Sequence, residues 1–279
     1  MTAAAHLDVD PAALASLASR LAQHVATEIL EMRERGVDVA ATKSSDVDVV
    51  TAADQAAERM LTEALIAERP ADGILGEEGA GRESASGITW VLDPIDGTVN
   101  YLYNIPAYAV SVAATVADPD AFADGRRAIA GAVCNPRTGE LFSAHVGGGA
   151  RLNGAPIRVS AQTELAQALV ATGFGYTVER RTEQAQIVAE LIPRVRDIRR
   201  IGAASYDLCL LAAGRLDAYY ERGLQPWDYA AGALIAREAG AELLGADATT
   251  PPGEPYLVAA NGDLASRLHA ALGLSGADA

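Results

Sequence analysis

The chain has 279 residues, of which half are hydrophobic and 21% are charged, as is typical of a globular protein with a sizeable core. Its formal net charge of -15 argues against a primarily nucleic-acid-binding role, because phosphate backbones are held by basic surfaces. Two cysteines, Cys134 and Cys209, are too few for a disulfide framework. We find no secretory signal pattern and no run of about 18 apolar residues, and we therefore expect a cytoplasmic protein without a membrane span.

The first half of the chain alternates between helical and strand patterns. Asp10-Pro11 is a good helix start, with Asp as the cap and Pro at the first position, so a helix is expected over 12–35, ending before Gly36. A second helix is expected over 54–68, from its apolar spacing. Short apolar runs predict four strands, at 89–92, 109–116, 128–133 and 140–144.

The second half repeats this alternation in kind, though not in sequence. Strands are expected at 168–172, 216–220 and 256–259. Helices are expected at 178–195 (interrupted by Pro193), 205–213, 229–239 and 264–272. The segment 118–125 reads as a polar turn. The whole pattern predicts an α/β chain.

The most informative stretch runs from Thr89 to Thr98. An apolar strand is expected to stop at Asp93, turn through Pro94 and reach Asp96, and Gly97-Thr98 then looks like the start of a helix. Carboxylates attract hard divalent cations such as Mg²⁺, and helix-start N–H groups attract phosphate. Two carboxylates held beside free N–H groups therefore suggest metal-assisted phosphoryl chemistry.

Two other segments carry acids that match this turn chemically. Glu77 and Glu78 follow the apolar pair Ile74-Leu75, and Asp228 lies at an expected helix start. Each has an ordinary structural explanation, since the glutamates could form a solvated turn and Asp228 could be only a helix cap. Alone, neither segment establishes a function.

Taken together, these motifs resemble the inositol monophosphatase family of Mg²⁺-dependent, lithium-sensitive sugar-phosphate phosphatases. The resemblance covers about 43–241, in which four motifs match in order. They are Lys43 to Asp54, Gly76-Glu77-Glu78, Trp90 to Asn100, and Trp227-Asp228 to Gly240. Relative to animal members the chain has a shorter 79–88 loop and an inserted 118–125 segment.

The resemblance implies two to three Mg²⁺ ions as cofactors. The ligands would be Glu77, Asp93 and the carbonyl of Ile95 for the first ion, and Asp93, Asp96 and Asp228 for the second. A weaker third ion would lie near Asp48 and Asp54 and be reached through Glu77 and waters. Lys43 matches a basic position near the same pocket.

The resemblance also implies catalytic and substrate-binding roles. Thr98 would bond the water that attacks phosphorus, with Asp54 polarising the Thr98 hydroxyl, and Glu77 would complete the catalytic set. The N–H groups of Gly97 and Thr98 would receive phosphate oxygens. The substrate-binding residues would be Asp96, Gly97, Thr98, Ala204, Glu221 and Asp228. Glu221 would accept hydroxyls of a polyol ring.

Two rival phosphatase mechanisms fit the residues less well. Cys209 and Arg215 have the Cys-x5-Arg spacing of cysteine phosphatases, but the residues between them are apolar and helical, whereas a phosphate cradle needs a bent loop. A buried core cysteine is the better interpretation. In haloacid-dehalogenase-type enzymes the two aspartates are two residues apart, and here Asp93 and Asp96 are three apart. Direct attack by water is therefore favoured over an aspartyl-phosphate.

We predict a phosphate monoester hydrolase that acts on inositol 1-phosphate, a small phosphorylated polyol. Histidinol phosphate and fructose 1,6-bisphosphate are alternative substrates. A non-enzymatic metal or sugar-phosphate sensor, or a protein-binding regulator, is the alternative from another class. No acid of the site has been lost, which favours the enzyme.

The family resemblance implies a layered αβαβα sandwich of the inositol monophosphatase and fructose-1,6-bisphosphatase type. We expect one unit over 1–279, with an N-terminal half (1–160) that carries most metal and phosphate ligands. The C-terminal half (161–279) would supply substrate contacts and Asp228. The resemblance also implies a homodimer. Neither a nucleic acid nor a membrane is expected as a partner.

Overall fold

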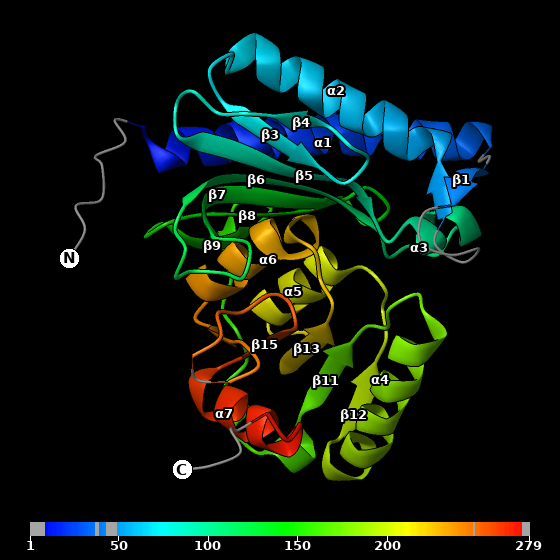
Figure 1. Cartoon of the computed structure of the whole chain (residues 1–279), viewed down its shortest axis with the longest axis vertical. Helices are drawn as coiled ribbons and strands as arrows, with labels where there is room; N and C mark the ends of the chain where they lie inside the picture. Colours follow the sequence, from blue (N-terminus) through cyan, green and yellow to red (C-terminus); the bar gives the residue numbers. More distant parts are fainter. Residues whose placement is uncertain (1–8, 37–38, 43–48, 248, 275–279) are drawn as a thin grey trace.

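Five layers of alternating helices and sheets make up the fold (Figure 1). The computed structural model describes residues 9–36, 39–42, 49–247 and 249–274. From top to bottom Figure 1 shows α1 and α2, an eight-stranded sheet, α5 and α6, and a five-stranded sheet. Helices α4 and α7 form the fifth layer, on the outer face of the five-stranded sheet. The αβαβα sandwich expected from the sequence is confirmed.

The helices of these layers, with the short α3, have the bounds α1 Pro11–Arg35, α2 Ala52–Glu68, α3 Thr98–Tyr103, α4 Val178–Leu191, α5 Ala204–Ala212, α6 Pro226–Glu238 and α7 Gly262–Ala271. Two single-turn helices, η1 (Leu165–Gln167) and η2 (Ile192–Arg194), flank α4 in sequence. Among the described residues, no helix is both long and apolar enough to cross a membrane.

The first sheet has the strand order β10-β9-β8-β7-β6-β5-β3-β4, and its only parallel pair joins β3 to β5 in the part of the chain described. Its strands are β3 Gly73–Gly76, β4 Gly81–Arg82, β5 Ile88–Asp96, β6 Ala109–Ala117, β7 Arg126–Asn135, β8 Glu140–His145, β9 Gly149–Leu152 and β10 Ala155–Pro156. A separate hairpin is formed by β1 (Val39–Thr42) and β2 (Val49–Thr51).

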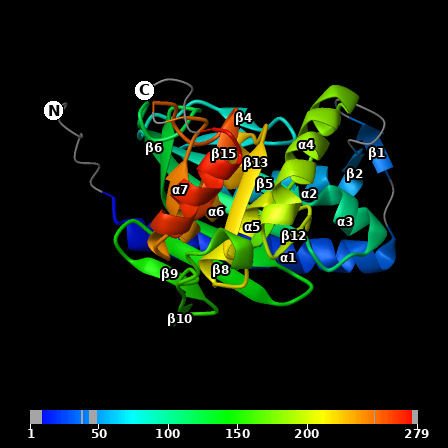
Figure 2. The same ribbon diagram turned by 90° about the horizontal axis from the view of Figure 1, so that it is seen from below.

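The second sheet has the order β12-β11-β13-β15-β14, with β11 parallel to both of its neighbours. Its strands are β11 Leu169–Thr172, β12 Asp197–Arg199, β13 Ala218–Arg222, β14 Glu242–Leu244 and β15 Tyr256–Ala260. Helices α4 and α7 both pack on the face of this sheet that lies away from α5 and α6, and Figure 2 shows them with β13 and β15 as seen from below.

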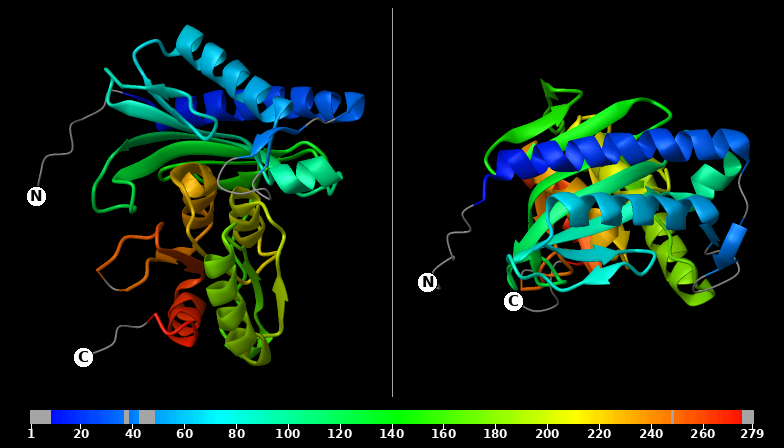
Figure 3. Two further views of the ribbon diagram at one scale, coloured as in Figure 1. Left: turned by 45° about the vertical axis from the view of Figure 1, so that its right-hand side comes forward. Right: turned by 90° about the horizontal axis from the view of Figure 1, so that it is seen from above.

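Helix α1 forms where the sequence predicts it. Asp10 accepts a hydrogen bond from the N–H of Ala12 at 2.9 Å, and Gly36 ends the helix with a φ of 117°. One face is buried at helical spacing and includes Leu14, Leu17, Leu21, Val25 and Ile29. This face packs on β6, β7 and β8, and α2 lies beside α1 on the same outer side of the sheet (Figure 3, right).

Strand β5 is buried on both faces because helices cover both sides of the sheet. Trp90 and Leu92 join the core beneath α1 and α2, whereas Val91 joins the core against α5 and α6. The alternation of side chains places Asp93 on the same face as Val91. The strand thus carries its terminal carboxylates toward the middle helix layer.

The structure corrects several predicted boundaries. Strand β5 does not stop at Asp93 but continues to Asp96, with an irregular register between them, because pairing with β6 resumes beyond Pro94. Helix α6 begins at Pro226 rather than 229, and α4 ends at Leu191, where a short 3₁₀ turn containing Pro193 takes over. The strands β1, β2, β3, β4, β9, β10, β12 and β14 were not predicted.

Candidate active site

A cavity of about 510 Å³ lies between the first sheet and the second half of the chain. It is lined by nine of the predicted site residues, namely Glu77, Asp93, Ile95, Asp96, Gly97, Thr98, Ala204, Glu221 and Asp228. Asp54 does not line it but contacts Thr98. Lys43 and Asp48 lie outside the described residues. Segments more than 100 residues apart are therefore brought to one place.

The end of β5 presents its acids to this cavity because the ladder is interrupted. Asp93 pairs with Ser111 and Asp96 with Ala109, so three residues of β5 cover two positions of β6. Pro94 has no N–H to donate, and the Ile95 side chain turns to the opposite core and is fully buried. Gly97 then adopts a left-handed φ of 89°, where a Cβ would come within 3.0 Å of the Ala107 carbonyl oxygen.

Asp93 is a buried carboxylate with an unpartnered oxygen. Its side chain is 1% exposed, and Oδ1 has no hydrogen-bond partner among the residues that the structure describes. Burial raises the pKa of Asp93 well above its usual value, and the carboxylates of Glu77, Asp96 and Asp228 raise it further. Such mutual repulsion indicates that the four acids converge, and a cation between them would relieve it.

Asp96 joins the two halves of the chain by accepting hydrogen bonds from the start of α5. Its Oδ1 accepts from the N–H of Ala204 at 3.1 Å, and its Oδ2 accepts from Ser205 N at 2.7 Å and Ser205 Oγ at 2.5 Å. Burial raises the pKa of Asp96, although the bonds from Ser205 oppose that shift. These bonds hold the carboxylate of Asp96 in one orientation at the start of α5.

Asp228 caps α6 as well as lining the cavity. It is the third helical residue, and its Oδ2 accepts from the N–H of Gln225 at 2.6 Å in a capping box. Burial raises the pKa of Asp228 well above its usual value, with Glu77 the strongest neighbouring charge. The structural and functional interpretations of this residue are therefore compatible.

Thr98 is held by a short chain of hydrogen bonds that leads away from the cavity. Its Oγ1 lies 3.1 Å from both Asp54 Oδ1 and the Ile95 carbonyl. The other oxygen of Asp54 accepts from Thr51 N at 2.7 Å and Thr51 Oγ1 at 2.5 Å in a capping box of α2. Burial raises the pKa of Asp54 to about 6. This chain fixes the direction of the Thr98 hydroxyl.

Glu221 lines the same cavity from β13. Tyr219 donates its hydroxyl to Glu221 Oε2 at 2.7 Å. Burial raises the pKa of Glu221 to about 7, against the opposing effects of Tyr219 and Arg200. A carboxylate so placed is an acceptor for hydroxyl groups of a bound molecule.

The carboxylate oxygens that line the cavity fit a hard divalent cation, although they do not meet at a single point. Among the described residues, no three His, Cys, Asp or Glu side chains already form a metal-binding group. The reason is that Asp96 turns to α5 and Asp228 to Gln225. The orphaned Asp93 oxygen and the carboxylate repulsion nevertheless match oxygen-ligand chemistry of the Mg²⁺ type.

The cysteine-phosphatase alternative fails on geometry. Cys209 is fully buried within α5, and burial raises the pKa of its thiol well above the usual value. Arg215 pairs with Glu140 at 2.5 Å instead of facing a phosphate cradle. A reactive cysteine needs a lowered pKa and access, and Cys209 has neither.

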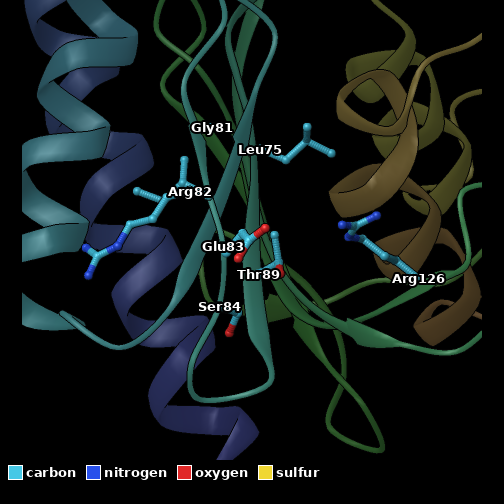
Figure 4. Close-up of a pocket in the computed structure, with 8 residues that line it drawn as sticks. Leu75, Gly81, Arg82, Glu83, Ser84, Thr89 and Arg126 are labelled. Atoms are coloured by element: carbon cyan, nitrogen blue, oxygen red, sulfur yellow. The ribbon is translucent and has the colours of Figure 1, made fainter.

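A second hollow of about 530 Å³ opens at the edge of the first sheet, around β4 (Figure 4). None of the predicted site residues lines it. In Figure 4 Arg82 points toward α2, away from Glu83, and Arg126 comes from the opposite side. The hollow therefore lacks the convergent acids of the candidate active site.

The sequence interpretation missed residues that hold the site residues in place. Thr51 and Ser205 orient Asp54 and Asp96, and Arg180 lines the cavity from α4. The Thr51-x-x-Asp54 spacing is a capping-box signal that could have been recognised. Ser205 lies 109 residues from Asp96, and no local pattern links the two.

Comparison with known proteins identifies the family. The model of the inositol monophosphatase family matches residues 10–275. The chain belongs to this family. An inositol-1-monophosphatase of Mycobacterium bovis is 44% identical over 95% of both chains. As a family member, the chain is a phosphatase, and the family implies a divalent metal cofactor and a phosphorylated small-molecule substrate.

Two further relatives of this inositol monophosphatase-family chain are informative. The solved structure of Mycobacterium tuberculosis SuhB matches with a TM-score of 0.79 and 45% identity, over 95% of this chain and 97% of that one. The Nus factor SuhB of Escherichia coli is 37% identical over 81% of this chain and 82% of its own length.

Proposed function

We propose that this chain is a Mg²⁺-dependent phosphatase that releases phosphate from inositol 1-phosphate. The observation that carries the proposal is the convergence of Glu77, Asp93, Asp96 and Asp228 around one cavity, with their carboxylates raising one another's pKa. The proposal treats the chain as one unit of two halves, 1–160 and 161–279. The name of the M. bovis relative supports the substrate.

The proposed metal site uses acids from both halves. Glu77, Asp93 and the Ile95 carbonyl would hold one ion, and Asp93, Asp96 and Asp228 a second. A third, weaker ion would lie near Glu77, on the side of Asp48 and Asp54. When bound, such ions neutralise phosphate oxygens and lower the pKa of the attacking water.

In the proposed mechanism the chain's own groups position the reactants. The hydroxyl of Thr98, directed by Asp54 at 3.1 Å, would orient the attacking water. The N–H groups of Gly97 and Thr98 would hold phosphate oxygens as charge develops on them. Glu77 would assist in removing the proton of the water. The N–H of Ala204 donates to Asp96, so its part would be to keep that ligand in place.

Substrate choice is assigned to Glu221. A buried carboxylate that accepts substrate hydroxyls discriminates against alcohols that leave it unpaired. Glu221 would therefore bond hydroxyls of the inositol ring, on the side of the cavity away from Thr98.

The decisive experiment measures phosphate release from inositol 1-phosphate and glycerol 2-phosphate with Mg²⁺ and with a chelator. We expect turnover only with Mg²⁺, and inhibition by Li⁺. Glu221→Gln is expected to lower kcat/KM for inositol 1-phosphate more than for glycerol 2-phosphate. Glu190→Gln, an exposed glutamate of α4, is the matched control. An unchanged ratio in Glu221→Gln would make histidinol phosphate or fructose 1,6-bisphosphate the leading substrate.

A regulatory role remains the second candidate, and the Nus factor relative favours it. A chain that binds metal and inositol phosphate but releases no phosphate would support the sensor. We also propose a homodimer in the cytoplasm, without a nucleic-acid or membrane partner. Sedimentation of the purified chain and fractionation of the source cells would test these two points.

A further inference from the structure

Three arginines line the cavity, and two of them are already engaged. Burial raises the pKa of Asp207 and of Glu221, and the neighbouring charge of Arg200 opposes that rise in both. Arg222 pairs with Glu183, and its guanidinium lies 5.8 Å from the centre of the Tyr256 ring. Arg180 differs: the one carboxylate recorded at ion-pair distance from it, among the described residues, is the exposed Glu254 at 3.5 Å.

Arg180 reaches the cavity through a gap that two glycines leave open. A Cβ on Gly175 would overlap Arg180 Cδ, and a Cβ on Gly223 would overlap its Nη1. Gly223 has a φ of 91°, but the backbone of Gly175 is one that other residues adopt. The aliphatic stem of Arg180 thus lies against the backbone of Gly175 and its guanidinium against that of Gly223, and the side chain is 36% exposed.

We propose that Arg180 is a specificity-determining residue that binds a second oxyanion, a phosphate or a carboxylate, on the alcohol part of the substrate. This inference rests on the proposed phosphatase function and extends its substrates beyond inositol 1-phosphate to phosphorylated alcohols that carry a second oxyanion. The guanidinium has five donors in a rigid fork that matches such a group, whereas one long contact to an exposed carboxylate uses few of them. Arg180 also lies in the first turn of α4, beside the cavity-lining cap Thr177, where the helix end favours an anion.

The location of Arg180 separates this role from the chemical step. It comes from α4, and its glycine neighbours lie after β11 and β13 in the second half. Thr98 and Asp93 belong to the first half and line the same cavity. Arg180 therefore acts on how tightly a substrate binds, and its loss is expected to raise KM while leaving kcat nearly unchanged.

The test compares phosphate monoesters that carry a second oxyanion with phosphate monoesters that do not. Fructose 1,6-bisphosphate carries a second phosphate and 3-phosphoglycerate a carboxylate, whereas glycerol 2-phosphate and inositol 1-phosphate carry neither. Arg180→Gln should lower kcat/KM for the first pair by about tenfold or more, the usual effect of losing a charged hydrogen bond. The second pair should change less than about twofold, within the range of an exposed substitution. The difference between the bisphosphate and the carboxylate identifies the preferred group.

Two further variants make the result specific. Gly175→Ala displaces Arg180 without removing its charge and should reproduce the selectivity of Arg180→Gln. Arg181→Gln, the exposed neighbour, should change none of the four substrates. An equal fall for all substrates in Arg180→Gln overturns the proposal. So does a wild type that neither cleaves nor is competitively inhibited by fructose 1,6-bisphosphate or 3-phosphoglycerate. Failure to release phosphate from any substrate would instead overturn the proposed function.

Discussion

At the scale of single residues, the site depends on groups that hold other groups. Asp54 lies outside the cavity and acts on it by accepting a hydrogen bond from the Thr98 hydroxyl. Ser205 likewise acts on the cavity by donating a hydrogen bond to Asp96. Positions of this kind control geometry more than binding. A substitution at Thr98 tests the orientation of the attacking water, and a substitution at Asp93 tests the buried charge of the site.

Thr98→Ala is expected to lower kcat by about a hundredfold and KM much less, because the hydroxyl would matter most when water attacks phosphorus. Thr98→Ser keeps the hydroxyl and should retain most of the activity. Steady-state kinetics on inositol 1-phosphate provide the measurement. A covalent phospho-enzyme trapped at Thr98 would contradict direct attack by water.

Asp93→Asn is expected to abolish Mg²⁺-dependent turnover yet stabilise the metal-free protein. The substitution removes a buried charge that faces three other carboxylates and has an unpartnered oxygen. A gain of about 1 kcal/mol would raise the Tm by roughly 2–4 °C in a chain of this size. Thermal unfolding in a chelator measures the Tm of both proteins. A lower Tm for Asp93→Asn than for the wild type would show that repulsion between Asp93 and the other carboxylates does not destabilise the metal-free fold.

At the scale of elements, the 118–125 segment supports the start of α6. The ring of Phe122 stacks on that of Tyr229, with centroids 5.2 Å apart and an interplanar angle of 17°. On the other side the guanidinium of Arg237 lies 5.2 Å from the Phe122 centroid. Tyr229 directly follows Asp228, so a segment expected to be only a polar turn buttresses a proposed metal ligand.

Phe122→Ala is expected to cost about 3 kcal/mol of stability, as for other buried aromatic rings. It should also raise the Mg²⁺ concentration needed for half-maximal activity, because Asp228 loses its support. Phe122→Tyr keeps the stack and serves as the control. Urea unfolding and Mg²⁺ titration of activity measure the two effects. An unchanged Mg²⁺ requirement in a folded Phe122→Ala variant would leave the segment a purely structural role.

Asp72, just before β3, ties two elements of the first sheet together. It is 2% exposed and accepts from Arg69 Nε at 2.8 Å, Trp90 Nε1 at 2.9 Å and Ser86 Oγ at 2.7 Å. Burial raises the pKa of Asp72, but the bonds from Arg69, Ser86 and Trp90 outweigh it and hold the pKa below its usual value. These hydrogen bonds thus stabilise the ionised form of the Asp72 carboxylate.

Asp72→Asn is expected to cost about 2–3 kcal/mol of unfolding free energy at pH 7, as for other bonds to buried charges. The folded pKa lies below the unfolded value of about 3.9, so this stability is present above that pH and is lost as the pH falls through the folded pKa. The difference in free energy of unfolding between the wild type and Asp72→Asn, measured with urea, should therefore decrease below about pH 4. A gap independent of pH would show that packing, not charge, is lost.

At the scale of the whole molecule, the proposed ligands join the two halves. Glu77, Asp93 and Asp96 come from the first half, and Asp228 comes from α6 in the second. A cation bound only by the folded chain stabilises it by about 2.7 kcal/mol at a concentration one hundred times its Kd. We expect Mg²⁺ to raise the Tm of the wild type and to have little effect on Asp228→Asn. Equal shifts in both proteins would place the ion elsewhere.

Local patterns predicted the elements with strong periodicity and the residues of the compact motifs. Helix α1, strands β6 and β7 and the cavity-lining acids lie where the sequence placed them. Contacts between distant segments could not be predicted, because Ser205 and Arg180 acquire their roles only when the halves pack. The extension of β5 through Pro94 was missed, since the pairing with β6 resumes at Ala109 and overrides the local turn signal.

The two ends of the cavity come from different parts of the chain. The groups proposed for phosphate and metal lie just after β3, on β5, at the start of α3 and, for Asp228, on α6. In contrast, Glu221, Arg180 and its flanking glycines lie on β13, on α4 and in the loops that border them. Inherited or engineered variation in the second group can change which alcohol is accepted while the first group stays intact. Proteins with this fold can therefore evolve a different substrate range while they keep the same groups for hydrolysis.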